Sequence, residues 1–234
     1  MVDVALEQGP EGYEDVAVLR MAAGENRFSP DWLSAVEDAV GQVEADDGPG
    51  ALVLVGAGKF FSNGLDLEYL GTQGPEAWGP YVERVHHLFA RVLGLGVPTA
   101  AALNGHTFAA GAMLSLACDL RVMRADRGFW CLPEVDIDIP FAPPMNALIT
   151  TKLPAPLAHE VMVFGPRVGG EDAAARGLVH EAVAEDEVLP RACRLVQERS
   201  GRKRSTMRAI KRRLHAEALG LLEEEGQRLG APTG

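Results

Sequence analysis

One short stretch, residues 104–119, limits the folds that this chain can adopt. It contains a turn of small residues at 109–111 and then an apolar run with no charged side chain before Asp119. Such a segment predicts a helix that is buried on all sides, so other elements must cover it. The N-terminus of a buried helix carries unpaired N–H groups and a partial positive charge, which suit a ligand oxygen that bears negative charge.

Strand and helix patterns alternate on both sides of this stretch. Apolar and β-branched runs predict strands, and amphipathic runs predict helices between them. The strands are expected at 15–21, 51–55, 97–103 and 120–123, and the helices at 30–45 and 76–93. Ser29 and Asp66 are the expected N-caps. The alternation predicts an α/β domain with right-handed crossovers.

The later part of the chain is mostly helical. Its helices are expected at 142–152, 155–164, 171–176, about 187–199 and 203–219, with a short strand at 178–183. We therefore expect an α/β core at 1–190 and a C-terminal helical region at 191–234, which packs against the core or a neighbouring subunit and completes the site.

Composition narrows the classes of partner. The chain has 234 residues, of which 47% are hydrophobic, and a formal net charge of −11. Its size fits one domain, and its charge argues against a nucleic-acid partner. Three unpatterned cysteines, Cys118, Cys131 and Cys193, favour a reducing, cytoplasmic setting. The apolar run at 107–118 is shorter than the ~20 residues that span a bilayer, so we expect a soluble protein without a membrane partner.

Two loops share one design. The segments at 62–66 and 108–112 each follow a strand, contain small residues and lead into a helix. If the two strands are neighbours, both loops lie at the carboxyl ends of the sheet strands, and two backbone N–H groups then converge on one oxygen as an oxyanion hole. Loops of this kind also occur as ordinary tight turns, so the pattern leaves both interpretations open.

Five motifs, in order, resemble the enoyl-CoA hydratase/isomerase, or crotonase, family. Residues 61–67, Phe-Ser-Asn-Gly-Leu-Asp-Leu, resemble its F-(S/A)-x-G-x-D-(L/I) signature. The others are Asn-Gly at 104–105 with Ala-Gly at 110–111, Cys-Asp-Leu-Arg at 118–121, Leu-Pro-Glu-Val at 132–135, and Ala-Ala-Ala-Arg-Gly-Leu-Val at 173–179. The resemblance covers roughly residues 15–215. It implies a crotonase-like ββα superhelix that assembles into a homotrimer or a hexamer.

The resemblance also assigns roles to residues. It implies that the N–H groups of Leu65 and Ala110 bind the carbonyl oxygen of an acyl-CoA thioester and stabilise its enolate. It places Asn63, Gly64, Phe108, Met113 and Lys211 around the substrate. Coenzyme A is then part of the substrate, and no separate cofactor is expected.

The carboxylates that are present limit which reaction of the family we expect. Hydratases of the family usually have one glutamate in the helix after the second loop and another in the Leu-Pro-Glu segment, but here the first position is Met113. Glu134 remains, and it is a surface glutamate or the catalytic base. The resemblance favours the base, because a single glutamate here is typical of Δ3,Δ2-enoyl-CoA isomerases, including those of plants. The predicted reaction moves the double bond of a 3-enoyl-CoA to the 2-trans position.

Other candidates are weaker. Asp136 and Asp138 flank Glu134 and are expected to face solvent, although some dienoyl isomerases of this fold use extra carboxylates. Among basic residues, Lys211 is the candidate for the CoA phosphates, and Lys59 and Arg27 are secondary ones. The pair His86 and His87 forms no metal-ligand pattern, so no metal is expected. A hydratase, another enolate enzyme and a catalytically silent acyl-CoA-binding protein remain alternatives.

Overall fold

A six-stranded sheet forms the base of the fold in the computed structural model, which describes residues 3–45 and 50–225. Its strands are β1 (Val4–Gln8), β2 (Val16–Met21), β3 (Ala51–Gly56), β5 (Thr99–Leu103), β7 (Leu120–Arg124) and β9 (Glu181–Val183). They lie in this order across the sheet, and only β1 is antiparallel to its neighbour. All the predicted strands are present, and β1 is an addition at the edge.

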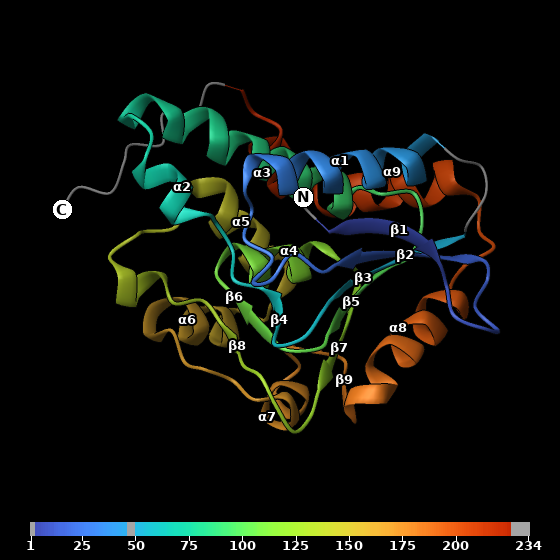
Figure 1. Ribbon diagram of the computed structural model, residues 1–234. Helices are drawn as coiled ribbons and strands as arrows, with labels where there is room; N and C mark the ends of the chain where they lie inside the picture. Colours follow the sequence, from blue (N-terminus) through green and yellow to red (C-terminus); the bar gives the residue numbers. More distant parts are fainter. Residues whose placement is uncertain (1–2, 46–49, 226–234) are drawn as a thin grey trace.

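A second, parallel sheet of three short strands lies beside the first. It consists of β4 (Phe60–Ser62), β6 (His106–Phe108) and β8 (Trp130–Cys131). After each of β3, β5 and β7 the chain enters a strand of this small sheet before it forms a helix. The chain therefore follows three ββα turns, which is the predicted superhelix (Figure 1).

Helices cover both faces of the large sheet. In the described part of the chain they are α1 (Pro30–Ala45), α2 (Leu67–Gly71), α3 (Trp78–Leu93), α4 (Ala110–Ala117), α5 (Pro143–Lys152), α6 (Ala155–Phe164), α7 (Gly170–Ala175), α8 (Val188–Gln197), α9 (Arg204–Leu214) and α10 (Ala216–Leu222). The single helix expected at 203–219 is two helices, because the chain bends at His215.

Strand β3 is buried along its whole length, as its apolar sequence predicts. Leu52 and Leu54 belong to the main core with α1, α3 and α4, whereas Val53 faces a second cluster that α8 covers. The expected boundary between residues 190 and 191 falls inside α8, which packs on the same sheet.

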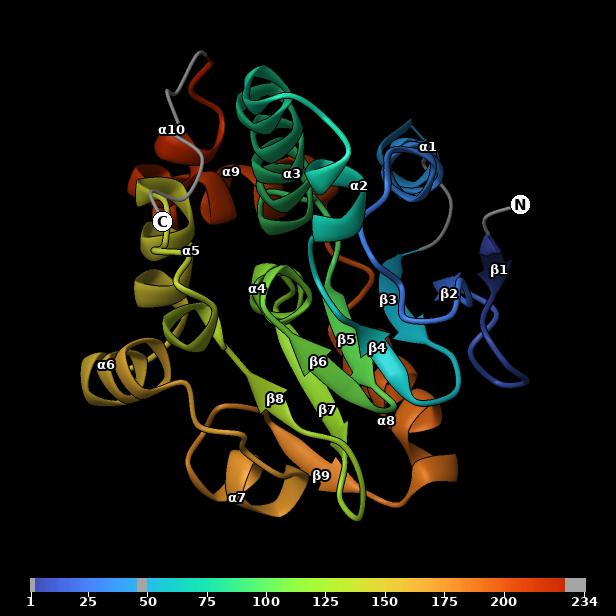
Figure 2. The same ribbon diagram turned by 60° about the vertical axis from the view of Figure 1, so that its left-hand side comes forward.

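Helix α4 lies at the centre of the molecule, between the small sheet, α3 and α5 (Figure 2). All eight of its residues are buried, which confirms the prediction from residues 104–119. Among the described residues, no helix combines the length and the apolar character that crossing a membrane requires.

Candidate active site

The two loops of shared design meet directly. They follow β4 and β6, which pair in the small sheet, and not strands of the large sheet. Gly64 makes the close approach possible: a Cβ added there would lie 2.9 Å from the Ala110 nitrogen and 3.0 Å from the Ala109 Cβ. Its φ of +85° also favours glycine. The first loop therefore requires glycine at this position.

The peptide between Gly64 and Leu65 has a fixed orientation. The Gly64 carbonyl accepts a hydrogen bond of 2.9 Å from the N–H of Phe28. In a trans peptide the C=O and the N–H point in opposite directions, so this bond turns the N–H of Leu65 away from Phe28. The N–H of Leu65 has no hydrogen-bond partner among the described residues.

The second N–H belongs to Ala110, the first residue of α4. The Ala109 carbonyl before it accepts a hydrogen bond of 3.1 Å from the N–H of Met113, which is the first turn of the helix. The N–H of Ala110 therefore points out of the N-terminus, and within the described chain nothing accepts its proton. Two donors without a partner among the described residues thus lie on adjacent loops.

Ala109 has an unusual backbone conformation, with φ 49° and ψ −124°. This region suits glycine and costs other residues about 1–3 kcal/mol. The sequence gives no sign of this strain, because alanine is ordinary in a small-residue turn. We infer that the surrounding loops impose the conformation and that it sets the direction of the Ala110 N–H.

Glu134 begins a short 3-10 helix, η2 (Glu134–Ile137), and its side chain is 6% exposed. Its Oε2 atom is buried and has no hydrogen-bond partner in the described structure. Burial without a partner disfavours the charged carboxylate. The pKa of Glu134 is accordingly raised by desolvation from 4.5 to about 7.

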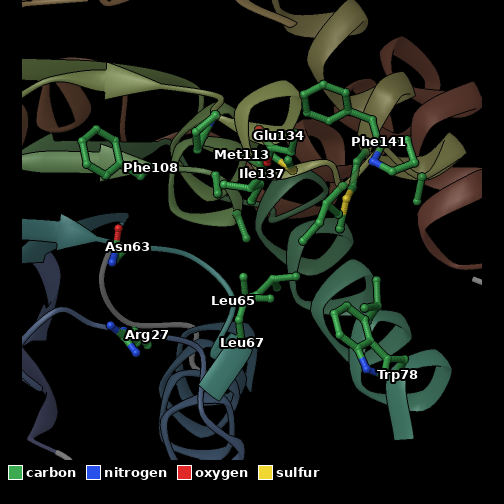
Figure 3. A pocket seen from close by; sticks show the side chains of 18 of the residues that line it. Arg27, Asn63, Leu65, Leu67, Trp78, Phe108, Met113, Glu134, Ile137 and Phe141 are labelled. Carbon is green, nitrogen blue, oxygen red and sulfur yellow. The ribbon is translucent and has the colours of Figure 1, made fainter. Parts of the chain in front are cut away.

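Leu65, Ala110 and Glu134 line one cavity of about 540 Å³, whose lining side chains are shown in Figure 3. Arg27 and Asn63 form a polar end, where both bind the carboxylate of Glu25 at 2.8 and 2.9 Å. Most of the remaining wall is apolar, and it includes Leu65, Leu67, Trp78, Val82, Phe108, Ala109, Ala110, Met113, Pro133, Ile137, Ile139, Pro140, Phe141, Ala142, Pro143 and Met145. Among the residues that line the cavity, Glu134 is the only carboxylate.

Most of the predicted site residues lie together here. Asn63, Leu65, Phe108, Ala110, Met113 and Glu134 line the cavity, and Gly64 lies behind it between the loops. Asp136 and Asp138 are exposed and do not line it. Lys59 is also exposed and outside the lining, whereas Arg27 is part of it. The apolar wall from α3 and α5 was missed, although the amphipathic pattern of α3 was a usable signal.

Lys211 is not in the cavity. Its side chain is buried, and its ammonium donates to the Val97 carbonyl at 2.8 Å and to Asp119 Oδ2 at 2.6 Å. Asp119 also accepts hydrogen bonds from the N–H and the hydroxyl of Thr99. Lys211 thus ties α9 to the core, and this arrangement does not support the expected contact with CoA phosphates.

No metal centre accompanies the cavity: in the part of the chain that is described, no three His, Cys, Asp or Glu side chains gather as metal ligands would. His86 is buried on α3, and burial lowers its pKa to about 4. All three cysteines are free and buried.

Comparison with known proteins identifies the family. The family described as enoyl-CoA hydratase/isomerase matches residues 11–228. The peroxisomal enoyl-CoA delta isomerase 2 of Arabidopsis thaliana is 33% identical over 220 residues, which cover 89% of this chain and 92% of that protein. A putative enoyl-CoA hydratase of Thermus thermophilus is 32% identical over 229 residues, which cover 96% of this chain and 88% of that protein.

The solved structures agree on the fold. An enoyl-CoA isomerase from Mycobacterium tuberculosis superposes with a TM-score of 0.84 at 27% identity, over 94% of this chain and 93% of that one. Isomerase and hydratase names thus occur among relatives at nearly equal identity, so the reaction must be argued from the site. The match over most of the chain and the shared fold show that this chain belongs to the enoyl-CoA hydratase/isomerase, or crotonase, family.

Proposed function

We propose that the protein is a Δ3,Δ2-enoyl-CoA isomerase that uses Glu134 as its single acid–base group. The observation that carries the proposal is the isolation of this carboxyl. Glu134, which has a buried and unpaired oxygen, lines the same cavity as Leu65 and Ala110, whose N–H groups have no partner among the described residues, and no second carboxylate lines that cavity. One proton carrier and two fixed donors are the groups that this isomerisation needs.

The thioester carbonyl oxygen accepts hydrogen bonds from the N–H groups of Leu65 and Ala110. This polarisation makes the C2 protons of a 3-enoyl-CoA more acidic. The Glu134 carboxylate removes one of these protons, and the C2 electrons delocalise into a dienolate whose negative charge is concentrated on the bound oxygen. No redox partner is needed, because only a proton moves.

The protonated Glu134 then returns its proton to C4. The electrons of the dienolate form the C2–C3 double bond as the C=O bond is restored, which gives the conjugated 2-enoyl-CoA. A planar dienolate presents C2 and C4 on the same face, so one carboxyl reaches both. A pKa of about 7 suits this shuttle, because near neutral pH the group both accepts and donates a proton readily.

Met113 argues against efficient hydration. Met113 is 1% exposed and lines the cavity, and a thioether cannot take a proton from water at neutral pH. Hydration requires a water molecule that is held and split beside the double bond. The hydratase alternative therefore lacks the second carboxylate that would orient this water.

The two ends of the cavity suggest the direction of the substrate. The polar end, with Arg27 and Asn63, suits the CoA portion, and the apolar wall, with Trp78, Phe141 and Met145, suits the acyl chain. We expect Arg27 and not Lys211 to be the cation of this chain nearest to the CoA portion.

Association into a trimer or a hexamer is part of the proposal. Val135 and Phe164 are 49% and 65% exposed, and they project from η2 and the end of α6. Large apolar side chains of this kind are often covered in an oligomer. Sedimentation analysis should give three or six chain masses, and a single chain mass would contradict this part of the proposal.

One pair of assays tests the reaction. The protein is incubated with 3-enoyl-CoA and, separately, with 2-enoyl-CoA, while the conjugated thioester and 3-hydroxyacyl-CoA are followed. We expect isomerisation of the first and little hydration of the second. Rapid hydration of the 2-enoyl substrate would refute the isomerase proposal, and no turnover of either would favour a catalytically silent acyl-CoA-binding protein.

The matched variants are Glu134→Gln and Asp136→Asn. Glutamine keeps the shape of the side chain but has no carboxyl group to accept and return a proton. Glu134→Gln should therefore abolish isomerisation and leave acyl-CoA binding nearly intact. Asp136→Asn removes an exposed carboxylate two residues away and should retain full activity. Activity retained in Glu134→Gln would remove Glu134 from its role.

A further inference from the structure

Leu65 lies between two peptide groups that are both held from outside its loop. The peptide before it is held by Phe28, through the Gly64 carbonyl. The peptide after it is held by Tyr81, whose hydroxyl accepts a hydrogen bond of 3.0 Å from the N–H of Asp66. The conformation of Leu65, and with it the direction of its N–H, is therefore fixed from both sides.

Tyr81 also binds the segment that contains Phe28. Its hydroxyl donates a hydrogen bond of 2.7 Å to the carbonyl of Phe28, the residue whose N–H holds Gly64. One hydroxyl has a single donor and accepts through its lone pairs, so Tyr81 uses both capacities to join Phe28 to Asp66. The segment of Phe28, the loop at 62–66 and α3 are thus joined by a closed set of hydrogen bonds around Leu65.

Tyr81 itself has no contact with the cavity. Its side chain is 7% exposed, and it is absent from the lining, although Trp78 and Val82 of the same helix belong to it. Burial raises the pKa of Tyr81 well above its ordinary value, so the hydroxyl keeps the proton that it donates.

We propose that Tyr81 is the positioning residue of the oxyanion hole: its hydroxyl holds the Leu65 N–H in the direction of the thioester oxygen. The inference rests on the proposed function, because it assigns the N–H of Leu65 to enolate stabilisation. A donor that is displaced loses part of its effect on the enolate, whose charge is greatest at the bound oxygen, while the neutral thioester of the ground state is affected much less.

Tyr81→Phe is the test variant, and Tyr69→Phe is its matched control. Phenylalanine removes one oxygen and keeps the ring. Tyr69 has its ring 6.1 Å from that of Tyr81, and its hydroxyl makes no hydrogen bond to any described residue. We expect Tyr81→Phe to lower kcat roughly tenfold with KM within about twofold, because misplacing a catalytic donor costs rate more than binding. Tyr69→Phe should match the wild type in both.

A spectroscopic readout separates positioning from a merely structural role. A 3-ketoacyl-CoA forms an enolate that absorbs in the near ultraviolet, so the fraction of bound ligand that is enolate reports the oxyanion hole directly. The affinity for a saturated acyl-CoA reports ground-state binding. Tyr81→Phe should reduce the bound enolate and leave the affinity for the saturated acyl-CoA unchanged.

The outcomes distinguish the two proposals. Equal enolate fractions in Tyr81→Phe and Tyr69→Phe would overturn the role of Tyr81, as would failure of the wild type to stabilise the enolate. A wild type that stabilises the enolate but does not isomerise 3-enoyl-CoA would refute the proposed function alone. If Tyr81→Phe does not fold, 3-fluorotyrosine at position 81 keeps the ring and the hydroxyl but weakens its acceptor, and it should reduce the enolate fraction to a smaller degree.

Discussion

Glu134→Gln should make the folded protein more stable at neutral and alkaline pH while it removes activity. In the folded state, desolvation raises the pKa of Glu134 from 4.5 to about 7. Each pKa unit corresponds to about 1.4 kcal/mol. The ionised carboxylate therefore costs the folded wild type about 3 kcal/mol, a cost that glutamine does not have.

The size of this cost depends on pH. Below pH 4.5 both the folded and the unfolded wild type hold the proton, so Glu134 adds no penalty. Between pH 4.5 and about 7 the folded state keeps the proton that the unfolded state has lost, so the free energy of unfolding falls as the pH rises. Above this range the penalty is constant.

Urea unfolding at a series of pH values measures this difference. The free energy of unfolding of Glu134→Gln minus that of the wild type should be near zero in acid and should approach about 3 kcal/mol by pH 8. Asp136→Asn, which removes an exposed charge from the same segment, controls for a general effect of charge. A difference that does not change with pH would refute the assignment of a buried, unpaired carboxyl to Glu134.

Three further predictions follow from the site. The rate of isomerisation should rise with pH through about 7, because the carboxylate of Glu134 starts the reaction, and a rate that is level from pH 5 to 8 would contradict this base. Met113→Glu adds a second carboxylate to the cavity wall, so we expect measurable hydration of 2-enoyl-CoA, followed as 3-hydroxyacyl-CoA, and none in Met113→Gln. Ala109→Gly should raise the midpoint of urea unfolding by relieving about 1 kcal/mol of strain at φ 49°, with kcat retained, and a lower midpoint would show that the backbone there is not strained.

The sequence predicted the large elements because each has a clear pattern over several residues. Strand β3 is apolar throughout and α3 is strongly amphipathic, and both were found within a residue or two of their expected bounds. The strands β4, β6 and β8 were missed because two or three residues are too few to show alternation. They become strands only because the superhelix places them side by side.

Part of the candidate site could likewise be predicted from the sequence, and part could not. Glu134, Leu65 and Ala110 were found through motifs, and the structure brings them to one cavity. The rest of the cavity wall includes residues that are distant in sequence, such as Trp78 and Val82 of α3, and no motif places these beside Glu134. Lys211 was misplaced for the same reason: a lysine in a basic helix looks solvated until its partner Asp119, 92 residues earlier, is known.

The ion pair between Lys211 and Asp119 has a consequence for biosynthesis. Asp119 lies between α4 and β7, so it is made 92 residues before its cation, Lys211. Until then, the partly exposed carboxylate of Asp119 has no cation from α9. Domains fold as units during synthesis, and this one cannot complete its interior until Lys211 has left the ribosome. A protein shortened before α9 should therefore be a target for proteolysis and not a smaller working enzyme.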